Sequence, residues 1–320
     1  MRAVWLALLV LLAVPAYARV PLQQLKLVSE HPVDGMTGGN LSGLAACNGV
    51  LWTVSDRDDL VLYRLERSQR VWQAEAVPIE VPQPPSDLPV SLRSLASLSA
   101  VVRGGGMDYE GISCDAQGNR YVVSEAHGAV LKVPVQGVPT WLPLPAQVIQ
   151  QAREKDMLQR FNALYEGIAI SPDGEQLWLA AEREQRGLLQ VRFKDGQWQC
   201  PDSCVLYHEA GVTPDKNRPL PDFSDVSLFN GKLFTLERSV YRVCRRSLDD
   251  GQIERCWSFA NEARKPERLY DQPYGLTEAL VVDETGAWIG TDNNFGARAD
   301  GEKRPVVWRF AAPTGGWSAP

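Results

Sequence analysis

Short apolar runs with alternating polar positions recur along the whole chain, and residues that favour turns separate them. In one such unit, the run from Glu110 to Asp115 is followed by a turn at Gln117-Gly118-Asn119 and by a second run from Arg120 to Glu125. Two short β-rich runs around a turn of this kind predict an antiparallel hairpin. The chain therefore reads as a series of hairpins.

The hairpins share a repeated signature. A cluster of an acidic residue or Ser, then Gly or Val, then an aliphatic residue opens one run, and an acidic residue closes the next. The units begin at positions 42, 110, 166, 225 and 274, so they recur every 49 to 68 residues. The paired clusters are Ser42-Gly43-Leu44 with Ser55-Asp56-Arg57, Glu110-Gly111-Ile112 with Ser124-Glu125, Glu166-Gly167-Ile168 with Glu182-Arg183, Asp225-Val226-Ser227 with Glu237-Arg238, and a degenerate fifth pair, Tyr274-Gly275-Leu276 with Asp292-Asn293-Asn294. This spacing fits a four-stranded blade with variable loops. We predict an all-β fold, a β-propeller of five to six four-stranded blades.

The acidic residues of these units are expected to gather in one place. In a hairpin, the start of the first strand lies beside the end of the second, so each opening acid meets a closing acid. If these strands line the central channel, the acids converge at one end of it, and like charges raise one another's pKa unless a cation lies among them. Oxygen ligands without Cys or His are typical of a hard divalent cation, here most plausibly calcium. The expected metal ligands are Glu110, Glu125, Glu166, Glu182, Asp225, Glu237 and Asp292.

A purely structural interpretation stands beside this one. The acids would only accept hydrogen bonds, and each Gly would allow tight packing of inner strands near the axis.

Arg57, Arg183 and Arg238 each follow a closing acid. Because side chains alternate along a strand, these arginines are expected to point away from that acid toward an adjacent blade. Binding of a substrate phosphate by the three arginines is the alternative.

Composition narrows the class of protein. Hydrophobic residues make up 44% of the 320 residues and the formal net charge is −6, which fits a globular protein and argues against a nucleic-acid or anionic-membrane surface. The chain has only three histidines, none with zinc-ligand spacing to a Cys pair. It has no Gly-x-Ser-x-Gly elbow, phosphate-binding Gly-Lys-Ser loop or dinucleotide fingerprint.

The N-terminus predicts export. Arg2 precedes the apolar run Val4 to Val14, and Ala16-Tyr17-Ala18 supplies small residues at the positions that signal peptidase reads. We expect residues 1–18 to be a signal peptide and residues 19–320 to be one domain. An uncleaved anchor is the alternative, but the run is shorter than the roughly 20 residues that a bilayer needs. The mature protein would be periplasmic or secreted, without a membrane span, and monomeric.

Six cysteines fit an oxidising compartment. Cys244 and Cys256 flank a turn, Cys200 and Cys204 enclose a short loop, and Cys47 and Cys114 end the first strands of neighbouring units. These are the three expected disulfides, out of the 15 pairings that six cysteines allow.

Two insertions precede acidic-Gly clusters. Leu92 to Val102 is expected to make one or two helical turns, and Gln147 to Phe161 an exposed amphipathic helix. Both would lie on the face of the acidic ring, where they could wall a pocket.

The stretch from Asp108 to Glu125 resembles the acidic D-x-E-G…G-x-x-Y-x-x-x-E stretch of the β-propeller phytases. With Phe161 to Arg183, Phe223 to Arg238 and Thr291 to Phe295, it resembles the phytase-like family described as having esterase-like activity. The resemblance implies carboxylates that bind calcium, carried over to Glu110 and Glu125, with phosphate esters as the substrate class. Ser42 and Tyr274 stand where this pattern would have an acid.

The expected function is metal-dependent hydrolysis of a phosphate or other ester, with Glu110 and Glu166 as catalytic residues. The alternative is a non-catalytic periplasmic binding propeller with a structural calcium, because many functions share this fold.

Overall fold

The computed structural model describes residues 22–67, 70–85, 88–92, 94–95, 106–183, 185–209, 222–272 and 276–319. The expected signal peptide lies outside these residues, as do Tyr274 and Gly275 of the degenerate fifth cluster.

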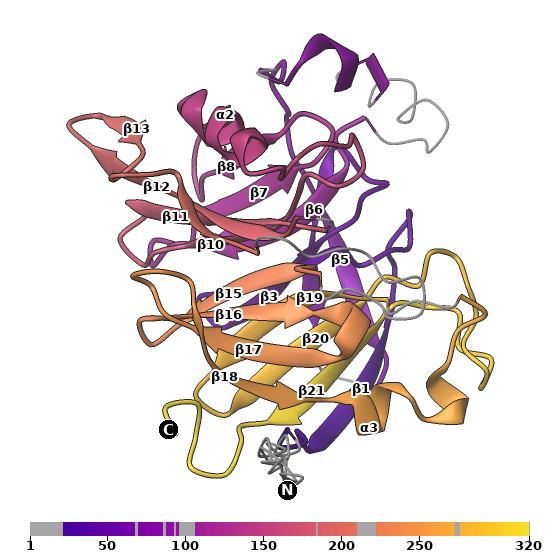
Figure 1. Ribbon diagram of the computed structural model, residues 1–320. Coiled ribbons are helices and arrows are strands. Elements are labelled where there is room, and N and C mark those ends of the chain that lie inside the picture. Colours follow the sequence, from indigo (N-terminus) through magenta and orange to yellow (C-terminus); the bar gives the residue numbers. More distant parts are fainter. Residues whose placement is uncertain are drawn as a thin grey trace, which may run out of the picture.

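Five sets of antiparallel strands form the blades of a propeller (Figure 1). The first blade contains β2 (Gly43–Cys47), β3 (Val50–Val54), β4 (Val61–Glu66) and β5 (Trp72–Pro78). The second contains β6 (Tyr109–Cys114), β7 (Arg120–Ser124), β8 (Ala129–Val133) and β9 (Thr140–Trp141). The third contains β10 (Tyr165–Ile170), β11 (Gln176–Ala181) and β12 (Gly187–Lys194), with both β13 (Gln197–Gln199) and β14 (Val205–His208) paired to β12. The fourth contains β15 (Asp225–Phe229), β16 (Lys232–Glu237), β17 (Arg242–Arg246) and β18 (Ile253–Ser258). The predicted all-β propeller is confirmed, and the described residues form five blades.

The fifth blade combines the two ends of the chain. It contains β19 (Thr277–Asp283), β20 (Gly286–Thr291), β21 (Val306–Ala311) and β1 (Leu27–Asp34) as its outermost strand. Figure 1 shows the indigo β1 beside the yellow β21, with which it pairs antiparallel. Parallel pairing of β1 with β5 joins the first and fifth blades into one eight-stranded sheet. The N-terminal strand therefore closes the ring.

The inner strands β2, β6, β10, β15 and β19 contact one another in this cyclic order and enclose the central channel. Their glycines lie backbone to backbone. A Cβ placed on Gly43 would lie 2.9 Å from the Cα of Gly111, and one on Gly111 would lie 2.9 Å from the carbonyl oxygen of Glu166. Real Cβ atoms do not come so close, so the predicted structural role of these glycines is confirmed.

Helices are few and short. Of the expected helix from Gln147 to Phe161, only α2 (Gln147–Glu154) forms, and it buries Val148, Ile149 and Ala152. Residues 90–92 and 94–95 are helical, and the rest of the expected turns up to Val102 lies outside the described residues. The connection after β18 carries α3 (Ala260–Ala263) and η2 (Pro266–Arg268), and η1 (Arg238–Val240) follows β16.

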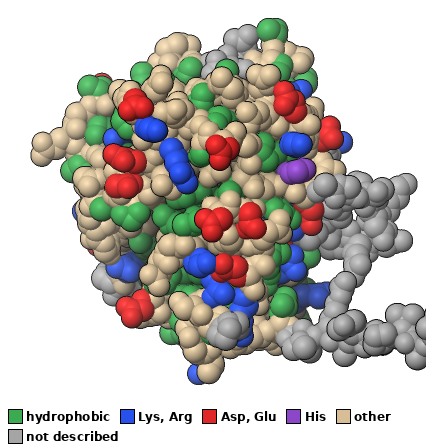
Figure 2. Space-filling model, turned by 60° about the vertical axis from the view of Figure 1, so that its left-hand side comes forward, with side chains coloured by type: hydrophobic (Ala, Val, Ile, Leu, Met, Phe, Trp, Pro, Cys, Tyr) green, Lys and Arg blue, Asp and Glu red, His purple; other side chains and the backbone are tan. Residues whose placement is uncertain are grey.

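All three expected disulfides are present. Cys47–Cys114 joins the inner strands of the first two blades, Cys200–Cys204 closes a loop, and Cys244–Cys256 joins β17 to β18. They fit a protein of an extracytoplasmic compartment. Within the described residues, no helix has the length and apolar character needed to cross a membrane. Figure 2 shows that acidic and basic side chains are interspersed among the described residues of the face that it presents.

Candidate functional site

Three glutamates reach the channel mouth because each lies at the same kind of irregularity in the inner strand of its blade. The register between first and second strand shifts between Tyr109 and Gly111, between Tyr165 and Gly167, and between Thr277 and Ala279. The residue inside each irregularity is Glu110, Glu166 or Glu278. A β-bulge re-aims the side chain of its extra residue, so these carboxylates leave the sheet and face the channel.

The closing acids Glu125, Glu182 and Asp292 hold equivalent positions one residue beyond the second strand of their blades, and Asp56 lies two residues beyond β3. The backbone N–H of Glu125 donates to the carbonyl of Asp108, that of Glu182 to Leu164, and that of Asp292 to Leu276. Each acceptor lies two residues before the bulged glutamate of its blade. In the first blade, the N–H of Asp56 donates instead to the hydroxyl of Ser42. Four closing acids therefore reach the same mouth as the three bulged glutamates.

These side chains line one cavity of about 450 Å³ at the channel mouth, here called the acidic cavity. Its lining residues are Asp56, Arg57, Glu110, Glu125, Asn162, Glu166, Glu182, Arg183, Asp222, Arg238, Glu278, Asp292 and Asn294. Of the expected ligands and substrate-binding residues, the structure brings together Glu110, Glu125, Glu166, Glu182, Asp292 and all three arginines.

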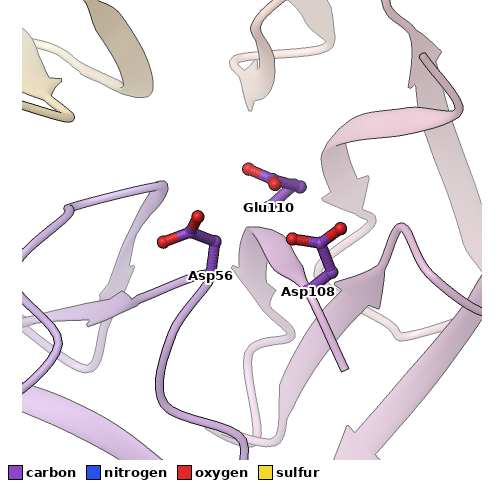
Figure 3. A group of neighbouring side chains, drawn as sticks. All are labelled: Asp56, Asp108 and Glu110. Carbon is purple, nitrogen blue, oxygen red and sulfur yellow. The ribbon is translucent and has the colours of Figure 1, made fainter. Parts of the chain in front are cut away.

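Three overlapping groups of buried carboxylates lie here, each with ligand atoms within 4.8 Å of one another. They are Asp56 with Asp108 and Glu110, Glu110 with Glu166 and Glu278, and Glu125 with Glu166 and Glu182. Figure 3 shows the carboxyl groups of the first group facing a common space. Groups of this kind are able to hold a metal ion.

Burial and mutual repulsion set the electrostatics of the acidic cavity. Burial raises the pKa of Glu110 well above its ordinary value, and the charges of Glu166 and Asp108 raise it further. The pKa of Glu166 is likewise raised by burial and by Glu182, although Arg238 lowers it in part. Burial also raises the pKa of Glu182 to about 8, against the opposing effect of Arg238. Without a further cation, the cavity holds more negative charge than its arginines compensate.

Two of the three arginines, Arg57 and Arg183, do not point where strand alternation predicts, whereas Arg238 pairs with acids of the neighbouring blades, as expected. Arg57 Nε lies 3.0 Å from Asp56 Oδ2, and Arg183 Nε lies 2.7 Å from Glu182 Oε2, so each pairs with the acid directly before it. The expectation that they point away from that acid is wrong, because both lie beyond the end of their strand. Arg238, in η1, does not pair with Glu237, the acid directly before it. It pairs across the cavity with Glu182, Asp222 and Glu278.

The fourth blade contributes differently from blades two, three and five, because its inner strand, like that of the first blade, has no bulge. Asp225 lies directly opposite Leu236 in the register, and its carboxylate accepts the N–H of Val226 at 2.8 Å and that of Leu280 at 2.6 Å. Asp225 therefore ties β15 to β19 and does not line the acidic cavity.

Glu237, the second expected ligand of this blade, also lies away from the acidic cavity. It is fully buried among Arg186, Arg242 and Arg246, with Glu237 Oε1 3.0 Å from Arg246 Nη2 and Glu237 Oε2 3.0 Å from Arg186 Nη1. Three guanidinium groups already compensate its charge.

Four acids of the site were not among the expected ligands. Asp56 closes the first unit of the repeat but was not assigned a role. Glu278 opens the fifth unit in place of Tyr274, and the missed signal was Thr277-Glu278-Ala279, with Ala where other units have Gly. Asp108 belongs to the recognised stretch but was not assigned a role, and its φ of 55° is a left-handed backbone conformation that non-glycine residues rarely adopt. Asp222 lies between strands, where no periodic signal marks it.

The donor set fits a hard cation. All candidate ligands are oxygen atoms, and within the described residues neither Glu110 nor Glu166 forms an ion pair with a Lys or Arg. An amide adds to the set, since Asn40 Nδ2 donates to Asp56 Oδ1 at 2.9 Å while the buried Asn40 Oδ1 has no hydrogen bond among the described residues.

Comparison with known proteins shows the family. The family model described as phytase-like, esterase-like activity of phytase, matches residues 37–295. The chain therefore belongs to the phytase-like family. No curated protein matches the sequence.

Solved structures match at low identity. The glutaminyl cyclase of Myxococcus xanthus is 12% identical, with 91% of this chain and 97% of that chain covered and a TM-score of 0.49. The PQQ-bound aldose sugar dehydrogenase of Streptomyces coelicolor is 11% identical, with 91% and 98% covered and a TM-score of 0.44. The virginiamycin B lyase of Staphylococcus aureus is 12% identical, with 91% and 75% covered and a TM-score of 0.40. Likeness at these levels says nothing about the activity of this chain.

Proposed function

We propose that this protein is an exported hydrolase of phosphate or other esters that depends on a divalent cation, most plausibly calcium, bound in the acidic cavity. One observation carries the proposal: two buried carboxylates that form no ion pair with Lys or Arg among the described residues, Glu110 and Glu166, share a cavity of about 450 Å³ with three arginines. A cation site and positive side chains in one cavity suit a substrate with an anionic or polar ester group.

The basic partners are unevenly distributed over the cavity. Arg238 lies among Glu182, Asp222 and Glu278, so its guanidinium already supplies positive charge there. Within the described residues no arginine pairs with Glu110, whose group also contains Asp108 and Asp56, and Arg57 contacts Asp56. We therefore assign the first cation to Asp56, Asp108 and Glu110, with Asn40 Oδ1 as a further oxygen. Asp225 and Glu237 drop out of the ligand set because their oxygens are used elsewhere.

The chain's own residues would divide the remaining chemistry. When bound, a divalent cation neutralises the carboxylates and withdraws electron density from an ester oxygen. Glu166 lies next to Glu110 and forms no ion pair among the described residues, so it is placed to take a proton from an attacking water as general base. Arg183, whose side chain is 47% exposed, is the arginine most open to the substrate's charge. The guanidinium of Arg238 would hold Glu182 and Glu278 in place.

A second function is favoured by the arginine pairing. Arg57, Arg183 and Arg238 each form ion pairs with acids of the cavity, so a bound phosphate would have to compete for them. A non-catalytic binding propeller, in which the cation closes the channel mouth and the face binds a ligand, needs no such competition.

Purified protein tests both functions together. After chelation and again with added calcium, it is assayed against a chromogenic phosphomonoester, a carboxyl ester and phytate. The hydrolase predicts calcium-dependent turnover that falls about 100-fold in Glu166→Gln, the loss typical of a positioned general base. A wild type that is folded, stabilised by calcium and inert toward all three esters would establish the binding propeller. No effect of calcium on melting or turnover would rule out the cation site.

A further inference from the structure

A second cavity, separate from the acidic cavity, lies between the fourth and fifth blades, beneath the connection from β18 to β19. Its volume is about 420 Å³, in the range of cavities that hold small molecules. We call it the lateral cavity, and it is lined by Tyr241, Ala263, Arg264, Arg268, Leu269, Tyr270, Gln272, Leu276, Thr277, Thr291 and Trp308. Thr277 and Thr291 each directly precede an acid of the acidic cavity, so the two cavities lie on opposite sides of the same strand ends.

Polar atoms without partners gather around this space. Among the described residues, the Thr277 hydroxyl, the Trp308 Nε1–H and the Gln272 Oε1 are buried and have no hydrogen bond. Thr277 is 2% exposed and Trp308 is 3% exposed. A buried polar atom left unpaired costs about 1 to 3 kcal/mol, so several around one cavity point to a molecule that satisfies them.

The chemistry of these atoms selects the ligand. An indole N–H only donates, an amide oxygen only accepts, and a threonine hydroxyl does both. A ligand that serves all three must offer acceptors and donors a few ångströms apart, as neighbouring hydroxyl groups do. The rings of Tyr241, Tyr270 and Trp308 add apolar faces against which C–H groups pack.

Charge argues for a neutral ligand. The guanidinium of Arg268 already binds Glu30, with Nε 2.7 Å from Glu30 Oε2, and also pairs with Glu262. Arg264 is exposed at the rim. No acid lines the lateral cavity among the described residues, so it lacks the ligands of a metal ion.

We propose that the lateral cavity binds a neutral, hydroxyl-rich small molecule of the monosaccharide or polyol class, held by Thr277, Gln272 and Trp308. The site is independent of the proposed hydrolase, because it uses none of the residues of the acidic cavity.

The test is calorimetric titration of the whole protein with glucose, galactose, mannose and sorbitol. We expect saturable binding of at least one of these probes, with Kd on the order of 1 mM. Thr277→Val keeps the shape and removes the hydroxyl, and Trp308→Phe removes the N–H. Each should weaken binding roughly tenfold, the effect of one lost hydrogen bond. Thr277→Val should not lower the melting temperature of the ligand-free protein, because the hydroxyl has no partner to lose.

Thr53→Val is the matched control, because the buried Thr53 hydroxyl donates to the Gly43 carbonyl at 2.7 Å, away from the lateral cavity. It should lower the melting temperature and leave sugar binding unchanged. Binding that survives both Thr277→Val and Trp308→Phe would overturn the proposal. So would the absence of binding by all four probes, which would mean that water alone fills the cavity. Chelator should not affect binding, so loss of the cation site and loss of this site are distinguishable.

Discussion

At the scale of single residues, two glutamates that both belong to the repeated acidic signature have opposite environments. Glu110 is buried among carboxylates, which raise its pKa, whereas Glu237 is buried among three arginines. A buried charge without a partner destabilises the fold. Removing a compensated charge leaves its partner charges buried without compensation. Replacing the two residues should therefore change the stability of the metal-free protein in opposite directions.

Glu110→Gln should stabilise the metal-free protein by about 1 kcal/mol or more, because it removes a carboxylate whose ionisation burial opposes. The same change should reduce the gain in melting temperature on adding calcium. Thermal melts in chelator and in calcium measure both effects. A lower melting temperature in chelator would show that Glu110 makes a favourable contact in the metal-free state.

Glu237→Gln should behave in the opposite way. It leaves Arg186 and Arg246 buried with less compensation and should cost roughly 3 kcal/mol. The calcium-induced gain should remain as in the wild type, since Glu237 does not line the acidic cavity. A calcium response lost in Glu237→Gln but kept in Glu110→Gln would reverse our assignment of the ligands.

At the scale of elements, the inner strands depend on glycine where they approach the next blade. Gly111→Ala would bring a Cβ within 2.9 Å of the Glu166 carbonyl oxygen and should cost roughly 2 kcal/mol or more from overpacking. Gly196→Ala, in a turn with φ of +80° and no atom within 4 Å of the new Cβ, should cost only about 1 kcal/mol from its left-handed backbone. Urea unfolding of both variants measures the difference. Equal losses would mean that the channel backbone moves aside easily.

The bulge is the element that directs the acid of an inner strand into the channel. Blades two, three and five share it and send Glu110, Glu166 and Glu278 into the channel. The fourth blade lacks it, and Asp225 turns to the backbone of the neighbouring strand. A shift of one residue moves a side chain to the other face of a strand, so the same sequence signature has two structural outcomes.

At the scale of the whole molecule, stability rests on ring closure by β1. This strand pairs with β21 and buries Val33, and its Glu30 pairs with Arg268 and Arg298. A chain that begins at residue 35 should lose cooperative thermal unfolding and aggregate, because β21 becomes an open edge. A chain that begins at residue 22 is the control and should melt cooperatively. Cooperative melting of the shorter chain, seen by circular dichroism, would show that four complete blades suffice.

The acidic cavity also predicts how the stability of the molecule depends on pH. Burial raises the pKa of Glu110, Glu166 and Glu182 in the folded state, for Glu182 to about 8. Between the ordinary value of 4.5 and these raised values, the metal-free folded protein holds more protons than the unfolded chain. Its stability should therefore fall as the pH rises from about 5 to 8.

Calcium should flatten this dependence, because a bound cation keeps the carboxylates ionised in the folded state. Melting temperatures across this range, in chelator and in saturating calcium, test the sign. A metal-free protein that becomes more stable as the pH rises would mean that the arginines already compensate the cavity.

The sequence by itself determined the architecture, because strand periodicity and a repeated cluster depend on neighbours along the chain. The recurrence from Ser42 to Asp225 gave the blades, and cysteine proximity gave all three disulfides. Glu110, Glu125, Glu166, Glu182 and Asp292 were correctly expected at one mouth of the channel, since a hairpin places its ends together.

Only the tertiary structure decided which acids remain uncompensated. Whether a carboxylate meets Arg238, a backbone N–H or another carboxylate depends on strand register and on residues 40 or more positions away. The sequence signature missed Glu278 because Ala279 replaces the expected Gly. It did not show that Glu237 lies away from the acidic cavity, because the arginines around Glu237 come from β17 and from the segment before β12. Charge compensation is a property of three-dimensional neighbours, so no pattern along the chain records it.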